Sequence, residues 1–371
     1  MRVLHLLSST SFAGAESMTL QLARAQRVAG VDARVALLDI GDGAAGALAA
    51  RFEAASVPVE IFATRGRVDP ALVKRLRARV GSDGIDLLHS HKYKCTLHAL
   101  LAAAGLPVPL VATYHNWILI DAWLRLYAAI DKRLARFCAA CVAVSEPVRL
   151  ELERFVPSRR VFKINNGIDP TWWVSPSGES RPVGPESPWI VGFVGRLSIE
   201  KGADLLIDAL AQLPEVAGRP MHALIVGDGP ERAALEEHAR RAGVAGRVKF
   251  AGATDDARRA YASMDVLALP SRVEGLPMTL LEAMSSQVPA VAMRVGEVPT
   301  VIRDGVNGWL SAGGSATDFA TALQTALGDA AETKKAGLAA RLSIIENYSA
   351  GTMAAAYQVI YGEALETAPR R

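Results

Sequence analysis

Several features that define other classes of protein are scarce in this chain of 371 residues. Its 3 cysteines, Cys95, Cys138 and Cys141, are too few for a disulfide framework and agree with a reducing compartment. No apolar run approaches the roughly 18 residues that a membrane-spanning helix needs. The opening run, Met1 to Leu7, is short and is followed by polar residues, unlike a signal peptide. We therefore expect a cytoplasmic protein without a transmembrane segment.

Metal and redox motifs are also poorly represented. Cys138-Ala-Ala-Cys141 has the C-x-x-C spacing of a redox pair or of half a zinc site. No second cysteine pair completes such a site, so two small residues at a junction between elements are the favoured interpretation.

Charge is nearly balanced in total but unevenly divided. The net charge is +3, yet residues 1–169 hold 22 Lys and Arg against 15 Asp and Glu. A basic surplus often indicates nucleic-acid binding, but the chain has no Lys/Arg-rich run and no nucleic-acid motif. We therefore expect no nucleic acid as partner, and an anionic membrane surface or a phosphate-bearing acceptor suits the first half better.

Strand-like and helix-like stretches alternate along the chain, which is typical of parallel sheets covered by helices on both faces. The pattern pauses in a stretch rich in Pro, Gly and Ser and restarts at Trp189. We expect an α/β fold of two Rossmann-like, doubly wound domains facing a central cleft. The predicted parts are a first domain at 1–170, a linker at 171–188, a second domain at 189–347 and a C-terminal helical segment at 348–371.

The most informative stretch follows the strand candidate that ends at Leu269. Glu274 lies in a turn with Gly and Pro, Glu282 comes eight residues later, and Pro277 stands where a helix can begin. The start of such a helix presents free backbone N–H groups, which suit a phosphate, and carboxylates suit the hydroxyls of a sugar. A nucleotide-sugar carries both groups.

The spacing Glu274-x7-Glu282 resembles the E-x7-E signature of the retaining GT4 glycosyltransferases, which have the GT-B fold. Gly195-Arg196, Lys201-Gly202 and Val226–Pro230 occur in the order of that family. One departure is Gly296-Glu297-Val298-Pro299-Thr300, where the family often has Gly-Gly-x-Pro-Glu. The resemblance implies that the second domain holds the donor, that the first holds the acceptor, and that the last helix, Tyr348 to Leu365, returns to the first domain.

The resemblance also implies roles for single residues. Arg196 and Lys201 meet the negative charge that grows on a leaving diphosphate. The chain has no Asp-x-Asp motif for a divalent metal, so we expect metal-independent catalysis and no cofactor. Glu282 accepts hydrogen bonds from the ribose hydroxyls, and Glu274 lies near the transferred sugar. Further donor contacts are implied for Gly14, Gly195, Gly252, Gly275, Leu276 and Pro277.

Histidines mark two predicted strand ends in the first half. Thr113-Tyr114-His115 resembles the family's Thr-x-His, which implies that His115 lies beside the donor sugar and the diphosphate. His89 and His91 form a His-x-His motif. A zinc site there needs further ligands, so pocket lining or ordinary polar packing is favoured. Glu16, next to the Gly14 loop, is a weaker candidate.

A helix is predicted from Ala122 to Phe137, with one apolar face that we expect in the core. Its basic residues, with Trp117 and Ile118 before it, form either a surface for anionic lipid or a plain solvated face. The apolar face comprises Trp123, Tyr127, Ile130, Leu134 and Phe137, and the basic residues are Arg125, Lys132, Arg133 and Arg136.

These observations predict a retaining glycosyltransferase that moves a hexose from a nucleotide-sugar. A UDP-sugar is the first expectation for the donor and GDP-mannose the second. The expected acceptor is a cell-envelope, lipid-linked or exopolysaccharide glycan. A sugar-nucleotide epimerase or a phosphorylase of the same fold is an alternative, and a non-catalytic two-domain sugar-binding protein belongs to another class.

Overall fold

The computed structural model describes residues 1–8, 14–39, 41, 43–115, 122–173, 187–254 and 256–367, with the backbone alone for 122–124. The chain forms two compact units. Unit 1 comprises Met1–Gly167 and Ala350–Arg371, and unit 2 comprises Ile168–Ser349. Residues 9–13 of the predicted glycine loop, Trp117, Ile118 and most of the predicted linker lie outside the described residues.

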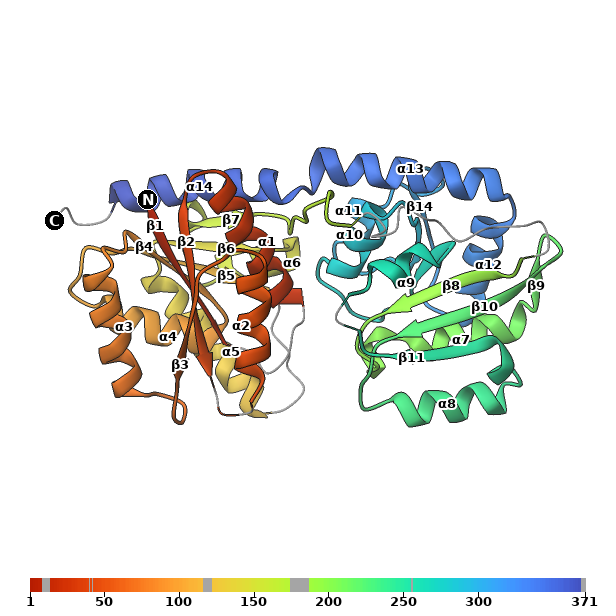
Figure 1. The fold of residues 1–371 in the computed structure, drawn as a ribbon, viewed down its shortest axis with the longest axis horizontal. Coiled ribbons are helices and arrows are strands. Elements are labelled where there is room, and N and C mark those ends of the chain that lie inside the picture. Colours follow the sequence, from red (N-terminus) through yellow and green to blue (C-terminus); the bar gives the residue numbers. More distant parts are fainter. Residues whose placement is uncertain are drawn as a thin grey trace. The chain divides into compact units, whose positions relative to one another are not determined.

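Unit 1 is a doubly wound parallel sheet with helices on both faces (Figure 1, left-hand body). The strand order is β3-β2-β1-β4-β5-β6-β7. Helices α1 and α14 contact each other, and α4 contacts both α3 and α5. The strands are β1 (Arg2–Ser8), β2 (Asp32–Asp39), β3 (Val59–Ala63), β4 (Leu87–His91), β5 (Leu110–Tyr114), β6 (Ala140–Ala143) and β7 (Val161–Lys163). The helices are α1 (Gly14–Val28), α2 (Ala44–Ala54), α3 (Pro70–Ser82), α4 (Tyr93–Ala103), α5 (Ala122–Leu134), α6 (Glu146–Glu153) and α14 (Ala350–Thr367), with short 3-10 turns at Ala135–Phe137 and Ser158–Arg160.

Alternation along the strands gives the two faces of this sheet different chemistry, because successive side chains of a strand point to opposite faces. Leu4, Leu6 and Leu88 belong to an apolar core that also contains side chains of α3 and α4. His5, which pairs in register with His89, therefore lies on the other face, where α1 and α14 cover it. One face of the sheet is thus an ordinary core, and the other carries buried polar groups.

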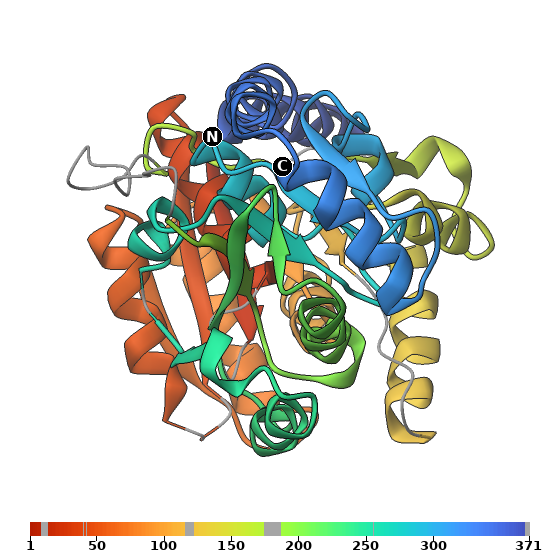
Figure 2. The same ribbon diagram turned by 90° about the vertical axis from the view of Figure 1, so that its right-hand side faces the viewer.

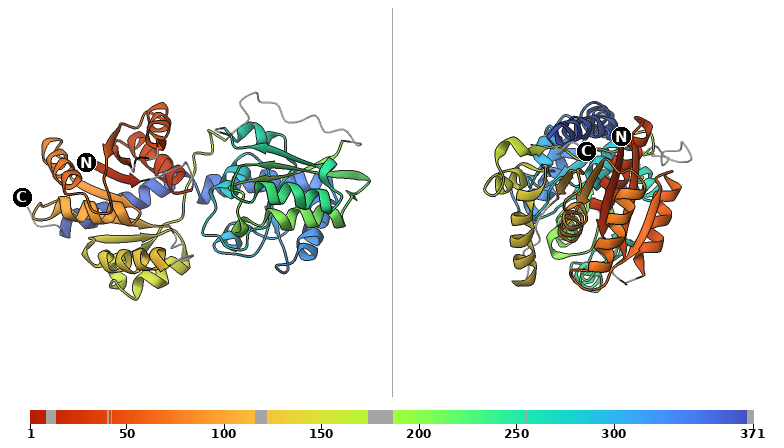
Figure 3. Two further views of the ribbon diagram at one scale, coloured as in Figure 1. Left: turned by 90° about the horizontal axis from the view of Figure 1, so that it is seen from below. Right: turned by 90° about the vertical axis from the view of Figure 1, so that its left-hand side faces the viewer.

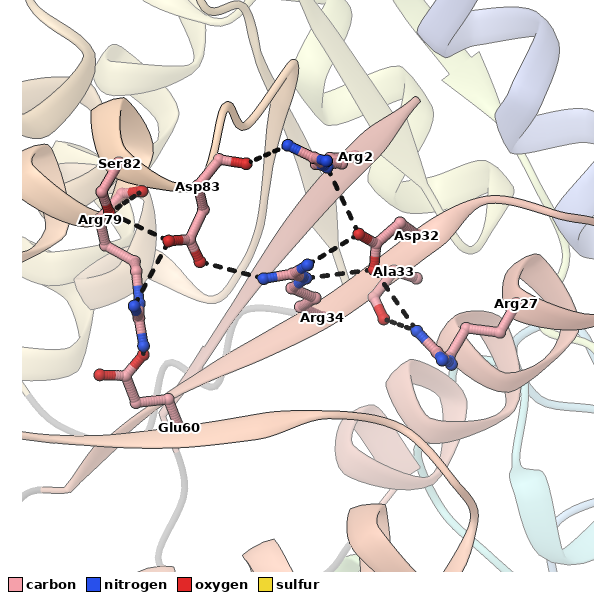
Figure 4. A network of polar contacts seen from close by, with 9 residues as sticks. All are labelled: Arg2, Arg27, Asp32, Ala33, Arg34, Glu60, Arg79, Ser82 and Asp83. Atoms are coloured by element: carbon pink, nitrogen blue, oxygen red, sulfur yellow. Dashed lines mark hydrogen bonds and ion pairs between the residues drawn. The ribbon is translucent and has the colours of Figure 1, made fainter.

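An ion-pair network closes the amino end of the same sheet (Figure 4). Arg34 donates two hydrogen bonds to Asp32, at 2.9 and 3.1 Å, and a third to Asp83 at 3.0 Å. The guanidinium of Arg34 holds the pKa of Asp32 below its usual value. Arg79 joins Asp83 to Glu60. Part of the basic surplus of the first half is therefore neutralised within the fold.

Unit 2 repeats this architecture with a mainly parallel sheet in the order β11-β10-β8-β12-β13-β14 (Figures 1 and 2). A short strand, β9, pairs antiparallel with β10. The strands are β8 (Trp189–Val194), β9 (Glu215–Val216), β10 (Arg219–Val226), β11 (Val248–Gly252), β12 (Val266–Leu269), β13 (Ala290–Ala292) and β14 (Gly308–Leu310). The helices are α7 (Ala203–Gln212), α8 (Arg232–Arg241), α9 (Arg258–Ala262), α10 (Met278–Ser285), α11 (Val298–Val301), α12 (Ala316–Leu327) and α13 (Ala330–Asn347), with 3-10 turns at Ile199–Lys201 and Ala245–Arg247.

The last helix of the chain belongs to unit 1. The predicted helix from Tyr348 to Leu365 is α14, and it packs on α1 (Figure 3). The backbone bridge between Ile168 and Ser349 lies where the chain enters and leaves unit 2. None of the described helices is long and apolar enough to cross a membrane.

The expectation that the apolar face of α5 lies in the core is wrong for two of its residues. Ile130 is 40% exposed and Phe137 is 74% exposed, whereas Ala128 and Ala135 are the buried apolar residues of this segment. The spacing of the larger side chains identified one face of the helix correctly but not what covers it. Tyr127 and Leu134 of the same face are half-buried, and Arg125 and Arg133 are exposed.

Candidate functional site

Each sheet has a topological switch point at its first strand, where open α/β sheets bind ligands beyond the carboxyl ends of the strands. In unit 1 the chain runs from β1 outward to β2 and β3 and then returns to the other side of β1 with β4. In unit 2 it runs from β8 to β10 and β11 and returns beside β8 with β12. The loops after β1 and β4, and those after β8 and β12, are therefore the places to look for a site.

In unit 2 an ion pair joins the two loops of the switch point. Nζ of Lys201, in the 3-10 turn after β8, lies 2.6 Å from Oε1 of Glu274, in the turn after β12. The hydroxyl of Ser271 donates to the same oxygen at 2.8 Å. The Glu274 side chain is 8% exposed and that of Lys201 is 30% exposed. Both contacts use Oε1, so Oε2 of Glu274 has no hydrogen-bond partner among the described residues.

Two glycines allow the loops around this ion pair to pack closely. Gly202 has φ of 68°, and a Cβ there would lie 2.1 Å from the carbonyl oxygen of Pro270. Gly296 has φ of 54°, and its Cβ would lie 2.3 Å from the carbonyl oxygen of Glu274. The loop that begins at Gly296 differs from the family pattern, yet it packs against the backbone of the Glu274 turn. The N–H of Glu297 donates a hydrogen bond to the carbonyl of Gly275 at 2.9 Å.

The second carboxylate, Glu282, lies on α10, whose N-cap residue is Pro277 as the sequence predicts. Glu282 is 9% exposed, and the hydroxyl of Tyr261 donates a hydrogen bond to its Oε2 at 2.8 Å. Burial raises the pKa of Glu282 to about 7, and the Tyr261 hydrogen bond acts in the opposite direction. Glu282 is thus a carboxyl group that changes its protonation near neutral pH.

The remaining predicted donor residues lie around these carboxylates. Arg196 is exposed two residues beyond the end of β8, and Gly195 between them donates its N–H to the carbonyl of Val226 at 3.0 Å. Gly252 ends β11 and accepts a hydrogen bond from the N–H of Gly227 at 2.8 Å. Leu276 and Pro277 follow Gly275 in the sequence between the two carboxylates, and both are buried. Unit 2 therefore brings backbone groups, two cations and two carboxylates to one edge of its sheet.

In unit 1 a chain of hydrogen bonds links the polar face of the sheet to α1 and α14. Nε2 of His5 contacts Oε1 of Gln26 at 2.8 Å, and the Gln26 amide donates to the hydroxyl of Tyr361 at 3.1 Å. That hydroxyl contacts Nδ1 of His89 at 2.6 Å. Nε2 of His89 contacts Thr113 at 2.7 Å, whose hydroxyl contacts Tyr357 at 2.9 Å.

The hydrogen-bond partners determine which ring nitrogens of His5 and His91 carry a proton. Burial lowers the pKa of His5 to about 4 and the pKa of His91 well below its ordinary value, so both rings are neutral. Nε2 of His5 donates to the Gln26 oxygen, so Nδ1 of His5 accepts from Nε2 of His91, which lies 3.1 Å away. Nδ1 of His91 is then an acceptor, and it is buried without a hydrogen-bond partner among the described residues.

Nitrogen atoms of His5, His89 and His91 lie within 4.8 Å of one another, close enough to hold a metal ion. The structure thus adds His5 to the His-x-His motif. Both nitrogens of His5 and of His89 already have hydrogen-bond partners, however. The cluster therefore satisfies itself by hydrogen bonding, and the zinc interpretation gains no support from its geometry.

An ion pair also joins the two loops of the switch point in unit 1. Nζ of Lys92, directly after β4, pairs with Oε1 of Glu16, in the first turn of α1 after β1. The Glu16 side chain is 1% exposed. His115 follows β5, and burial lowers its pKa to about 4, with the positive charge of Lys92 acting in the same direction. Gly14 begins α1 and is exposed.

Two family models match the chain: "Glycosyltransferase Family 4" over residues 12–172 and "Glycosyl transferases group 1" over residues 179–343. The structure is similar to that of HepE from Anabaena in complex with UDP-glucose, with a TM-score of 0.81, 26% identity and coverage of 99% of this chain and 100% of that one. The chain belongs to the GT-B-fold glycosyltransferases. The predicted fold class and family resemblance are confirmed.

Curated relatives of this glycosyltransferase match most of its length but only part of their own. Sulfoquinovosyl transferase SQD2 of Arabidopsis thaliana is 30% identical over 302 residues, covering 73% of this chain and 55% of that protein. D-inositol 3-phosphate glycosyltransferase of Nocardia farcinica is 29% identical over 294 residues, covering 73% of this chain and 65% of that protein.

Several polar residues around the candidate sites of this glycosyltransferase are absent from the sequence prediction. Ser271 lies two residues beyond the end of β12 and three before Glu274, a position that could have drawn attention to it. Lys92 directly follows the His-x-His motif in the same way. Tyr261 and Tyr361 carry no local signal, because their partners are distant in sequence.

Proposed function

We propose that this protein is a retaining, metal-independent hexosyltransferase that uses a nucleotide-sugar, with a UDP-sugar as the first candidate donor. The observation that carries the proposal is the Lys201–Glu274 ion pair across the switch point of unit 2, with the buried Glu282 on the helix that follows. The UDP-glucose bound in the HepE structure supports UDP as the nucleotide.

Each of these groups has a task in sugar transfer. Departure of a nucleoside diphosphate leaves negative charge, which Lys201 and the exposed Arg196 stabilise. The ionised carboxylate of Glu282 accepts hydrogen bonds from the ribose hydroxyls, and the backbone at Gly195 and Gly252 lines the nucleotide. Oε2 of Glu274 accepts a hydrogen bond from a hydroxyl of the transferred sugar while Oε1 holds Lys201.

We further propose a cell-envelope, lipid-linked or exopolysaccharide acceptor that binds unit 1, with His115 beside the transferred sugar and Gly14 at the glycine loop. A site on the cytoplasmic face of a membrane agrees with α5, where Leu126, Ile130 and Phe137 are exposed. Such a mixture of apolar and basic side chains is typical of helices that lie on anionic lipid.

The test is a screen of nucleotide-sugars for hydrolysis by the full chain, because slow hydrolysis reports the donor without a known acceptor. We expect release of UDP from UDP-glucose or UDP-galactose, and loss of that activity in Lys201→Ala. The control is Lys249→Ala, which removes an exposed lysine of β11. An epimerase would convert the sugar without releasing UDP, and a sugar-binding protein would turn over no nucleotide-sugar, so either result would refute the proposal.

A further inference from the structure

The backbone at Lys92 adopts a conformation that suits glycine. Lys92 is the N-cap residue of α4 and has φ of 105° and ψ of 152°. A residue with a side chain is strained in this backbone conformation, and such strain is common at functional sites. Glycine would form the same turn at no such cost. A lysine at this position therefore indicates that its side chain has a use.

The contacts of Lys92 place that side chain at the switch point of unit 1. Glu16 lies in the first turn of α1, and its buried carboxylate holds the Lys92 ammonium. A buried ion pair adds little to the stability of a fold, because the cost of removing both charges from water offsets most of their attraction. The Lys92 side chain is 36% exposed, and Glu16 is its one hydrogen-bond partner among the described residues. Two of the three ammonium hydrogens are therefore available to a ligand.

Two histidines on which the positive charge of Lys92 acts each have a buried ring nitrogen without a hydrogen-bond partner among the described residues. Nδ1 of His91, the residue before Lys92, is buried, lacks a proton and has no partner in the described part of the chain. Nε2 of His115 is likewise buried without a partner there. The two rings lie 6.3 Å apart between centroids. A buried polar atom without a partner is unfavourable, and a ligand hydroxyl that donates a hydrogen bond to it removes that cost.

Unit 2 has a lysine–glutamate pair at the corresponding place, with the order of the charges reversed. There the lysine follows the first strand of the sheet and the glutamate follows the strand that returns beside it. In unit 1 the glutamate, Glu16, follows the first strand and the lysine, Lys92, follows the returning strand. The Lys92 ammonium thus lies at the edge of the unit 1 sheet where ligands bind in open α/β folds.

We propose that Lys92, oriented by Glu16, binds a phosphate group of the acceptor, while Nδ1 of His91 accepts a hydrogen bond from a hydroxyl of the same molecule. The substrate class is a phosphorylated sugar or polyol. This inference rests on the proposed function, since it names the acceptor of that transfer. Lysine is a common phosphate ligand as a point charge, and Arg196 and Lys201 of unit 2 already serve the donor diphosphate.

The experiment compares the binding of glucose 6-phosphate and of glucose to the UDP-saturated full chain by calorimetry. The test variant combines Lys92→Gly with Glu16→Gln, which relieves the strained backbone and leaves no buried carboxylate unpaired. Lys94→Met, a loss of the same charge two residues along α4, is the matched control. We expect the wild type and the control to bind glucose 6-phosphate about 10-fold to 100-fold more tightly than glucose, as for hydrogen bonds to a charged group. The test variant should bind the two sugars about equally.

The outcomes separate this inference from the proposed function. Absence of the preference in the wild type, its persistence in the Lys92→Gly, Glu16→Gln variant, or an equal loss in Lys94→Met would each overturn it. Weaker binding of UDP itself by the test variant would also overturn it, because Lys92 would then serve the donor diphosphate. If the proposed function is wrong, the wild type releases no UDP from any nucleotide-sugar, whatever its preference between glucose 6-phosphate and glucose.

Discussion

The buried carboxyl of Glu282 makes the affinity for the donor depend on pH. Ribose hydroxyls donate hydrogen bonds to the ionised carboxylate, so only the ionised fraction of the protein binds well. With the pKa raised to about 7 by burial, that fraction increases about tenfold between pH 6 and pH 8, and the observed affinity follows it. We therefore expect the dissociation constant for UDP-glucose to fall about tenfold over this range and to level off at higher pH.

The same group links pH to the stability of the unliganded protein in the opposite direction. The pKa of Glu282 is about 7 in the folded state against 4.5 as its ordinary value, so the folded state holds the extra proton between these limits. Stability is therefore lost as pH rises through this window, by roughly 3 kcal/mol in all. Glu282→Gln removes the charge and should unfold at a higher temperature than the wild type at pH 8.

Isothermal titration calorimetry of UDP-glucose at half-unit steps of pH measures the effect. UDP-glucose is preferred to UDP because the terminal phosphate of UDP titrates near pH 6. Glu282→Gln serves as the control, since it should bind more weakly and without the pH dependence. An affinity of the wild type that is constant from pH 6 to pH 8, or a variant that keeps the same dependence, would show that Glu282 does not bind the ribose as a carboxylate.

Four further outcomes follow from the structure. Lys201→Ala should lower kcat by about 100-fold or more with little change in donor KM, as for a lost oxyanion donor, and a wild-type kcat would assign the diphosphate to other residues. Activity should survive EDTA, whereas full loss that Mg²⁺ or Mn²⁺ restores would contradict metal independence. Tyr361→Phe removes a hydroxyl with two buried polar partners and should lower the free energy of unfolding, measured in urea, by about 1–3 kcal/mol. The control is Val359→Ala, a substitution at an exposed position of α14. Equal effects of the two substitutions would refute the reasoning. The wild type should float with anionic vesicles at low salt, and Arg125→Glu with Arg133→Glu should release it while UDP affinity stays the same; failure to float at any salt concentration would return α5 to a plain solvated helix.

Local patterns in the sequence were sufficient for the fold and for the candidate site of unit 2. Parallel strands followed by glycine turns were predicted because their apolar runs are short and regular. Lys201 and Glu274 are 73 residues apart, yet the doubly wound topology brings the ends of β8 and β12 to one edge. The topology therefore explains why these two residues lie at the same edge, whereas their 2.6 Å contact is known only from the structure.

Three features depend on information that local patterns do not contain. Tyr361 and His89 are 272 residues apart, and nothing in either segment identifies the other as a partner. The backbone of Lys92 is unusual for a lysine, so its sequence context predicts an ordinary turn. The apolar residues of α5 show helical spacing, but spacing alone does not decide whether solvent or core meets Ile130 and Phe137.

The return of the chain through α14 makes unit 1 discontinuous in sequence and unit 2 an inserted domain. The two junctions are adjacent in unit 1, where the N–H of Gly167 lies 3.2 Å from Sδ of Met353. A recombinant fragment that stops at Gly167 would lack Tyr357 and Tyr361 and would leave the polar face of its sheet without the cover that α14 supplies. Excision of residues 168–349 with a short peptide joining Gly167 to Ala350 preserves that face, and it is the way to prepare the first domain by itself.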